Sequence, residues 1–186
     1  MESDIIYRPD ALTPKQTDLP THIGIDPGKT GAICFFWSKK DLSLFKMPET
    51  EHDIKNLIAD ETTNWFSVKR KLPEVNALIE QVNGMPKDGG SRAFNFGKSY
   101  GFIRGIITAA GIPLDEVHPT RWQKHFNLPT LKSCGGSKPA KKKLHKQKAQ
   151  QLLPEIASDI TAITADAALI ALYSYERYKV IRLKKG

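Results

Sequence analysis

The sequence of 186 residues has only two cysteines, and it lacks any apolar run long enough to cross a membrane. Two thiols make neither a disulfide framework nor a metal knuckle, so we expect Cys34 and Cys134 to be reduced. The N-terminus also lacks the basic-then-apolar pattern of a secretion signal. We therefore expect a soluble intracellular protein with no membrane partner, of a length that suits one domain.

A phosphate-cradling loop of the P-loop type is absent as well. The tripeptide Gly97-Lys98-Ser99 has no glycine at the required upstream position. We therefore expect no nucleotide cofactor. The glycine-rich segment 83–92 instead predicts a mobile loop beside an active site.

Carboxylates are missing between Glu116 and Glu155, although this interval holds nine lysine and arginine residues. Segregated positive charge is the footprint of proteins that bind nucleic-acid phosphates, and the net charge of +8 agrees with it. A solvated basic face or a disordered arm is the alternative interpretation. The basic residues that we expect to contact phosphates are Lys87, Arg92, Arg121, Lys124, Lys138, Lys141, Lys142, Lys143 and Lys146.

Short apolar segments separated by turns predict an α/β fold with a mixed sheet flanked by helices. The strands of an antiparallel three-strand meander are expected at 22–26, 32–36 and 42–47, and further strands at 75–82 and 112–118. Helical patterns cover 52–72, 97–111, 140–153 and 163–176. We expect a poorly ordered extension over 1–21, one domain over 22–178 and a basic tail over 179–186.

Small residues recur at every fourth position of the predicted helix 97–111, as Gly97, Gly101, Gly105 and Ala109. Glycine costs about 1 kcal/mol against alanine in a helix interior, so a packing reason is expected. The pattern predicts that this helix approaches the sheet or a partner helix closely.

Three acids stand where secondary structures begin or end. Asp26 ends a strand and is followed by Pro-Gly-Lys-Thr-Gly, and Glu80 follows Ala-Leu-Ile near the end of another strand. Asp166 is expected in the first turn of an apolar helix capped near Thr164. Each has a structural alternative: Asp26 shaping a turn, Glu80 reaching solvent, and Asp166 favoured by the helix dipole.

Together the three acids predict more than each does alone. Carboxylates crowded at one sheet edge repel each other unless cations neutralise them, and Mg²⁺ prefers such oxygen ligands. Two ions about 4 Å apart activate a water and stabilise the leaving oxygen of a phosphodiester. With the basic surface, the pattern predicts a nuclease in which Asp26, Glu80 and Asp166 are catalytic and hold the metal.

Five motifs in order resemble the RuvC-type Holliday junction resolvases of the RNase H-like superfamily, particularly the phage and organellar branches. They are Ile-Gly-Ile-Asp26-Pro-Gly-x-Thr-Gly-Ala, Leu-Ile-Glu80-Gln-Val, Phe-x-Phe-Gly-x-x-x-Gly, Pro119-x-x-Trp122-x-Lys124 and Ala165-Asp166-Ala-Ala-Leu-Ile-Ala. The resemblance covers residues 22–175. It implies an RNase H-like fold and a homodimer that makes paired nicks in four-way DNA, dependent on Mg²⁺ or Mn²⁺.

The resemblance also implies that the loop after Glu80 enters the junction, where Met85, Pro86, Phe94 or Phe96 would act as a wedge. One position departs from the family. A fourth acid or a histidine is expected three to five residues before the last aspartate, where this chain has Thr161, Ala162 and Ile163. Asp159 is the substitute that we expect, and only if the chain up to Asp166 is not helical, since a helix would separate the two by about 10 Å.

Two alternatives remain at this stage. The segment around Asp26 also looks like the first phosphate loop of sugar kinases and actin-like ATPases, although those need two such lobes and this chain has one copy. The other alternative is a non-catalytic or less selective protein that binds branched DNA on the same fold, with structural acids.

Overall fold

The computed structural model describes residues 5–7, 21–62, 75–82 and 89–183, and its strands form one six-stranded sheet. The strands are β1 (Ile5–Tyr7), β2 (His22–Asp26), β3 (Ala32–Ser38), β4 (Asp41–Lys46), β5 (Asn76–Glu80) and β6 (Leu114–Val117). Their order across the sheet is β1-β4-β3-β2-β5-β6. β2 is therefore a central strand, with β3 on one side and β5 on the other.

The sheet is mixed, as predicted. β2, β3 and β4 pair antiparallel in sequence order because short turns join them. β5 pairs parallel with β2, and β6 pairs parallel with β5. Parallel neighbours need a crossover connection, and helices lie on both of the connections that precede β5 and β6.

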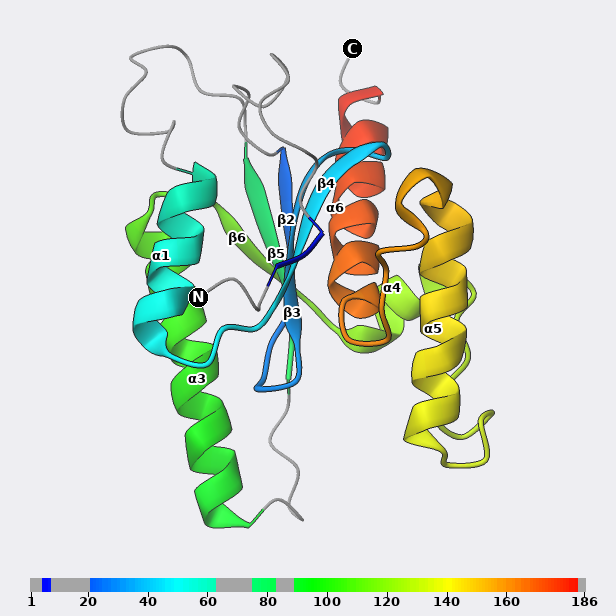
Figure 1. The fold of residues 1–186 in the computed structure, drawn as a ribbon, viewed down its shortest axis with the longest axis horizontal. Coiled ribbons are helices and arrows are strands. Elements are labelled where there is room, and N and C mark those ends of the chain that lie inside the picture. Colours follow the sequence, from blue (N-terminus) through cyan, green and yellow to red (C-terminus); the bar gives the residue numbers. More distant parts are fainter. Residues whose placement is uncertain (1–4, 8–20, 63–74, 83–88, 184–186) are drawn as a thin grey trace.

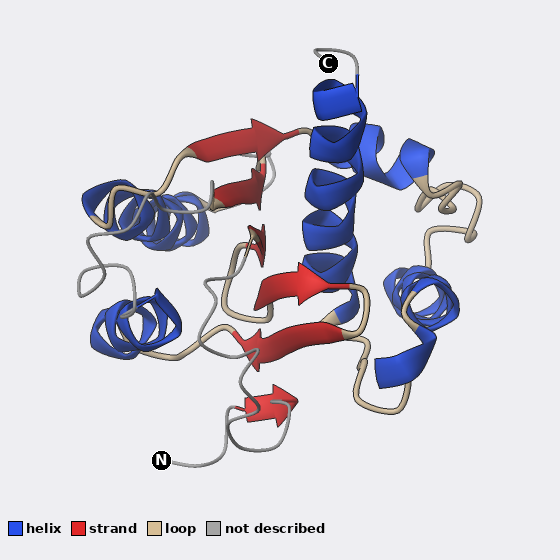
Figure 2. Cartoon of the chain, turned by 90° about the horizontal axis from the view of Figure 1, so that it is seen from above, coloured by secondary structure: helices blue, strands red, loops and turns tan. Residues whose placement is uncertain are grey.

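The helices cover both faces of the sheet. They are α1 (Glu51–Thr62), α3 (Gly90–Ala109), α4 (Pro119–His125), α5 (Lys138–Leu152) and α6 (Ala165–Leu183), with a short 3₁₀ helix η2 (Pro154–Ile156) before α6. α1 and α3 lie on one face, and α4, α5 and α6 lie on the other (Figure 1 and Figure 2). Within the described residues, no helix combines the length and the apolar character that a membrane span requires.

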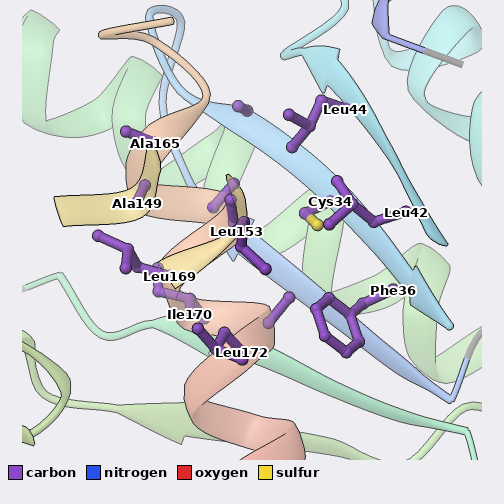
Figure 3. Packing of buried hydrophobic residues seen from close by; sticks show 14 of the residues in the cluster. Cys34, Phe36, Leu42, Leu44, Ala149, Leu153, Ala165, Leu169, Ile170 and Leu172 are labelled. Atoms are coloured by element: carbon purple, nitrogen blue, oxygen red, sulfur yellow. The ribbon is translucent and has the colours of Figure 1, made fainter. Parts of the chain in front are cut away.

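Two apolar clusters sandwich the sheet because side chains alternate between the faces of each strand. Odd-numbered residues of β2, β3 and β5, such as Ile25 and Ile79, pack with α1 and α3. Even-numbered residues, such as Cys34 and Leu78, pack with α5 and α6. Figure 3 shows this second cluster, where β3 and β4 meet α5 and α6. Asp26 and Glu80 share the even parity, so both belong to the face that α6 covers.

α6 lies directly on β2 because Gly24 has no side chain. A Cβ at Gly24 would lie 2.3 Å from the carbonyl oxygen of Ala167 and 2.4 Å from the amide nitrogen of Ala171. Ala167 and Ala171 are themselves fully buried, so small residues line both sides of the contact. The backbones therefore meet at van der Waals distance along this stretch.

Two elements extend into the terminal segments that were expected to lie outside the domain. Ile5–Tyr7, within the segment predicted to be poorly ordered, forms β1 and pairs antiparallel with β4. This three-residue edge strand has no periodicity of its own, so the sequence carries no signal for it. At the other end, α6 continues to Leu183 into the predicted tail, because no glycine or proline stops it before Gly186.

The predicted helices α1 and α3 also differ in their limits. α1 ends at Thr62, and the rest of the predicted segment 52–72 lies outside the described residues. α3 begins at Gly90, inside the segment predicted to be a loop. The glycine pattern does not bring α3 to the sheet, since Cβ atoms at Gly97, Gly101 and Gly105 would meet nothing within 4 Å among the described residues. α3 packs on the sheet through Ile103 and Ile107 instead, and contact of the glycine face with a partner helix stays a prediction.

Replacing Gly24 with alanine should destabilise the fold, whereas the same change at Gly101 should stabilise it. The new Cβ at position 24 meets backbone atoms that cannot rotate away, and overpacking of this kind costs about 1–3 kcal/mol or more. The new Cβ at position 101 enters open space in a helix interior, where alanine gains about 1 kcal/mol over glycine. Urea unfolding of the two variants measures both signs, and equal effects would contradict the packing of α6 on β2.

Candidate active site

Asp26 and Glu80 end adjacent parallel strands on the same face of the sheet. The register of β2 and β5 pairs Ile25 with Ile79, so the two acids follow matched positions. Both side chains are half-buried. The alternation of the strands thus brings two carboxylates to one edge of the sheet, as the sequence predicted.

A glycine-dependent turn follows Asp26. Gly28 has a φ of 114°, which side chains other than glycine rarely adopt, and its carbonyl oxygen accepts from the amide of Gly31 at 2.9 Å. A Cβ at Gly31 would lie 2.0 Å from the carbonyl oxygen of Asp26. Phe96 of α3 covers the turn, since a Cβ at Gly28 would lie 3.2 Å from its ring. The turn therefore fixes the backbone at Asp26 from both sides.

Asp166 is the second residue of α6, in its first turn, as predicted. Its Oδ1 atom accepts a hydrogen bond from Nδ1 of His145 on α5 at 2.6 Å. An ionised carboxylate only accepts, so Nδ1 carries the proton of this hydrogen bond. His145 is 1% exposed, and its Nε2 atom is buried without a hydrogen-bond partner in the described part of the chain.

Glu80 has a donor of its own from α4. The indole Nε1 of Trp122 donates to Oε2 of Glu80 at 2.8 Å. Trp122 is fully buried. Its ring also meets the ring of His145 edge to face, with centroids 5.7 Å apart. The two donors that hold the acids are therefore in contact with each other.

The three acids lie close enough for electrostatic interaction between their carboxylates. Burial raises the pKa of Asp26 well above its ordinary value, and the charges of Asp166 and Glu80 raise it further. Lys142 and Lys141 act in the opposite direction. The acids predicted from the sequence are thus neighbours in space, and two lysines of α5 partly offset their charge.

The pKa of Glu80 is raised for related reasons. Burial is the largest cause, and the charge of Asp166 adds to it. The hydrogen bond from Trp122 lowers this pKa, as do Lys141 and His145 nearby. These three neighbours therefore offset part of the cost of burying the Glu80 carboxylate.

The donor chemistry of this site fits a divalent cation, although the side chains do not form a ready-made cage. Carboxylate oxygens are the ligands that Mg²⁺ prefers, and here burial and the neighbouring charge of Asp166 raise the pKa of both Asp26 and Glu80. As they stand, the described residues contain no group of three or more His, Cys, Asp or Glu side chains that would hold a metal ion. Trp122 and His145 instead occupy one oxygen each of Glu80 and Asp166.

Asp159, the predicted substitute for a fourth ligand, lies in a turn after η2. Its Oδ2 accepts a hydrogen bond from the hydroxyl of Ser158 at 2.9 Å. Residues 160–164 are not helical, which meets the condition set for it, and its role as a ligand stays a prediction. His145 is the residue at the site that sequence analysis missed. A sequence pattern could have revealed it: His145 lies four residues before Ala149, so both are on the same, buried side of the lysine-rich helix α5.

The predicted DNA-contact residues fall mainly on α4 and α5. On these two helices, the exposed residues are Arg121, Lys124, Lys138 and Lys143. The half-buried ones are Lys141, Lys142 and Lys146. Arg92 is in the first turn of α3. Lys87, Met85 and Pro86 lie outside the described residues.

The two predicted wedge aromatics on α3 differ in their surroundings. Phe94 is 73% exposed. Phe96 is half-buried, covers Gly28 and stacks on Tyr100 with centroids 6.2 Å apart. Of the two, Phe94 is the one whose ring is free to meet another molecule.

The raised pKa of Asp26 predicts an unusual pH dependence of stability in the absence of divalent metal. The folded state holds the proton more tightly than the unfolded state, so the free energy of unfolding should fall as pH rises above 3.8, the ordinary pKa. Asp26→Asn removes this penalty and should be more stable than the wild type at neutral pH. Urea unfolding in EDTA across a pH series tests this, with exposed Asp115→Asn as the matched control. A less stable Asp26→Asn at neutral pH would contradict it.

Comparison with known proteins gives the fold. No family model matches the sequence, and no curated protein matches it. A structure of T. thermophilus RuvC in complex with a Holliday junction substrate matches with a TM-score of 0.54 and 16% identity, over 81% of this chain and 89% of that one. Another T. thermophilus RuvC structure matches with a TM-score of 0.50 and 18% identity, over 85% and 96%. This protein therefore has a RuvC-like fold, with a mixed sheet flanked by helices.

Proposed function

We propose that this protein is a structure-selective DNA endonuclease that resolves four-way junctions by metal-dependent hydrolysis of phosphodiesters. The observation that carries the proposal is the cluster of Asp26, Glu80 and Asp166, whose charges act on one another at one edge of a RuvC-like sheet. Burying several carboxylates together lowers the stability of the fold unless a cation or hydrogen bonds compensate them. A divalent cation would relieve the cost.

The three acids would hold two Mg²⁺ or Mn²⁺ ions. When bound, such ions supply an activated water and stabilise the leaving oxygen of a phosphodiester. Trp122 and His145 orient two of the acids through hydrogen bonds. Lys141 and Lys142, whose charges reach Asp26, would attract the phosphate that approaches the site. Asp159 stays a weaker candidate for a further ligand.

The four-way junction is the substrate that the fold supports. The matched T. thermophilus RuvC is in complex with a Holliday junction substrate, and the basic residues of α4 and α5 lie on the α6 side of the sheet, as the acids do. We extend the proposal to a homodimer with two active sites, because paired nicks need two. The nuclease domain would span the predicted 22–178 together with the rest of α6. Phe94 and Met85 would meet the centre of the junction, and Lys87 and Arg92 would contact its phosphates.

A second candidate is a protein that binds branched DNA without cutting it, or a nuclease of lower selectivity. It is favoured by the hydrogen bonds that Trp122 and His145 make to Glu80 and Asp166, since these acids are already satisfied in part. The ATPase alternative has less support, because the described strands belong to one sheet rather than to two lobes.

Asp26→Asn and Glu80→Gln should each abolish cleavage of four-way junctions and leave junction binding intact. Both changes remove a carboxylate that would hold the metal while keeping the shape of the side chain. The measurement compares fixed-branch and mobile four-way junctions with linear duplex, in Mg²⁺ or in EDTA, and maps the nicks. Asp115→Asn on β6 is an exposed control with the same change of charge. A variant that nicks at the wild-type rate would contradict the metal assignment, and junction binding without nicking by the wild type would favour the second candidate.

Replacing Lys141, Lys142 and Lys143 with alanine should weaken junction binding and flatten its salt dependence. Each phosphate contact that is lost reduces the slope of log affinity against log salt by about 0.9. Binding is measured in EDTA, so that effects on metal do not enter. Lys55→Ala on α1, on the opposite face of the sheet, is the control for a lost exposed lysine. An unchanged slope would show that these lysines are only a solvated face.

A further inference from the structure

Two helices that contribute none of the three acids each send one donor into the candidate site. Trp122 from α4 donates to Glu80 at 2.8 Å, and His145 from α5 donates to Asp166 at 2.6 Å. Both donors are buried, with exposed fractions of 0% and 1%. These side chains are therefore shielded from water and held by the core around them.

Packing alone does not explain this arrangement. A buried indole N–H needs a hydrogen-bond partner, but a backbone carbonyl would satisfy it as well as a carboxylate does. Here the N–H meets a carboxylate at a strand end, and the imidazole meets a second carboxylate of the same cluster. The two rings also meet each other edge to face at 5.7 Å and 80°. Glu80 and Asp166 are thus joined by a continuous chain of contacts through Trp122 and His145.

We propose that Trp122 and His145 are a coupled pair of positioning residues, each of which fixes the orientation of one acid at the metal site. This inference rests on the proposed function, because orienting the acids matters only if they bind an ion. Hydrogen bonds to the ligands of a metal keep them aligned and raise its affinity. The ring contact makes the orientation of Glu80 depend on that of Asp166, so loss of either donor disturbs both acids.

The geometry of His145 separates positioning from ligation. The positioning role uses Nδ1, whereas a role as metal ligand would use Nε2, which has no partner among the described residues. Asparagine places an amide N–H near the position of Nδ1 and nothing at the position of Nε2. His145→Asn should therefore keep the function of a positioning residue and lose that of a ligand, and His145→Leu should lose both.

Mn²⁺ affinity, measured by calorimetry without DNA, tests the proposal independently of cleavage. Trp122→Phe and His145→Leu should each weaken Mn²⁺ binding by about 10- to 100-fold, as loss of such partners does elsewhere. His145→Asn should keep most of the affinity. The double variant of Trp122→Phe and His145→Leu should lose less than the product of the two single losses, because the pair acts as a unit. Junction binding in EDTA should not change.

Phe126→Leu is the matched control for a buried aromatic. Phe126 belongs to the same apolar cluster and lies directly after α4, so the change costs packing without removing a donor. It should lower the free energy of unfolding and leave Mn²⁺ affinity intact. Wild-type affinity in Trp122→Phe and His145→Leu would overturn the proposal, and a loss of affinity in His145→Asn equal to that in His145→Leu would assign His145 as a ligand instead.

A metal-free measurement separates failure of this inference from failure of the proposed function. The indole N–H signal of Trp122 is the one absent from the ¹H–¹⁵N spectrum of Trp122→Phe, and Glu80→Ala should move it upfield because the bond to the carboxylate is lost. An unmoved signal overturns the inference whatever the metal does. A wild type that binds no Mn²⁺ and cuts no junction overturns the proposed function. In that case, additive losses of unfolding free energy in Trp122→Phe and His145→Leu would overturn the coupling as well.

Discussion

The close packing of α6 on β2 at Gly24 is the contact on which the candidate site depends. It places backbone against backbone, so the position of the first turn of α6 is set by the sheet rather than by flexible side chains. Asp166 occupies that turn, and Asp26 ends the strand beneath it. A larger residue at position 24 would lift the helix and separate the two acids. The absence of a side chain at position 24 therefore determines where the two acids meet.

The packing that builds the site also makes it electrostatically costly. Burial disfavours the charged form of Asp26 and Glu80. The charge of Asp166 disfavours the ionisation of both, and the charge of Glu80 disfavours that of Asp26. The fold compensates in part, with an indole donor for Glu80, an imidazole donor for Asp166 and two lysines of α5 near Asp26. These donors and lysines stabilise the acids in their positions, but they do not remove the repulsion between the carboxylates.

What the sequence predicts of this site follows from local periodicity. The alternation of strand residues puts Asp26 and Glu80 on one face, and the start of an apolar helix locates Asp166, so these positions can be read without a structure. Trp122 and His145 escape this kind of reading, because their hydrogen bonds join residues 42 and 21 positions apart in the chain. β1 escapes it too, since an edge strand of three residues depends on pairing with β4 for its order. The glycines of α3 led to a wrong expectation of sheet contact through that face. A row of small residues shows that a helix face could pack closely, but it does not show which element packs there.

In the proposed function, Lys141 and Lys142 act on the carboxylates of the site and on DNA phosphates, and this would couple metal binding to DNA binding. Lys141 and Lys142 offset the charge of Asp26 in the free protein, and in the proposed function they also attract phosphates. A lysine that pairs with a phosphate offsets less of the carboxylate charge, and the phosphate adds negative charge of its own. Both changes increase the attraction of the site for a cation. Because binding free energies are reciprocal, an ion that binds more tightly with DNA present must in turn hold the DNA more tightly.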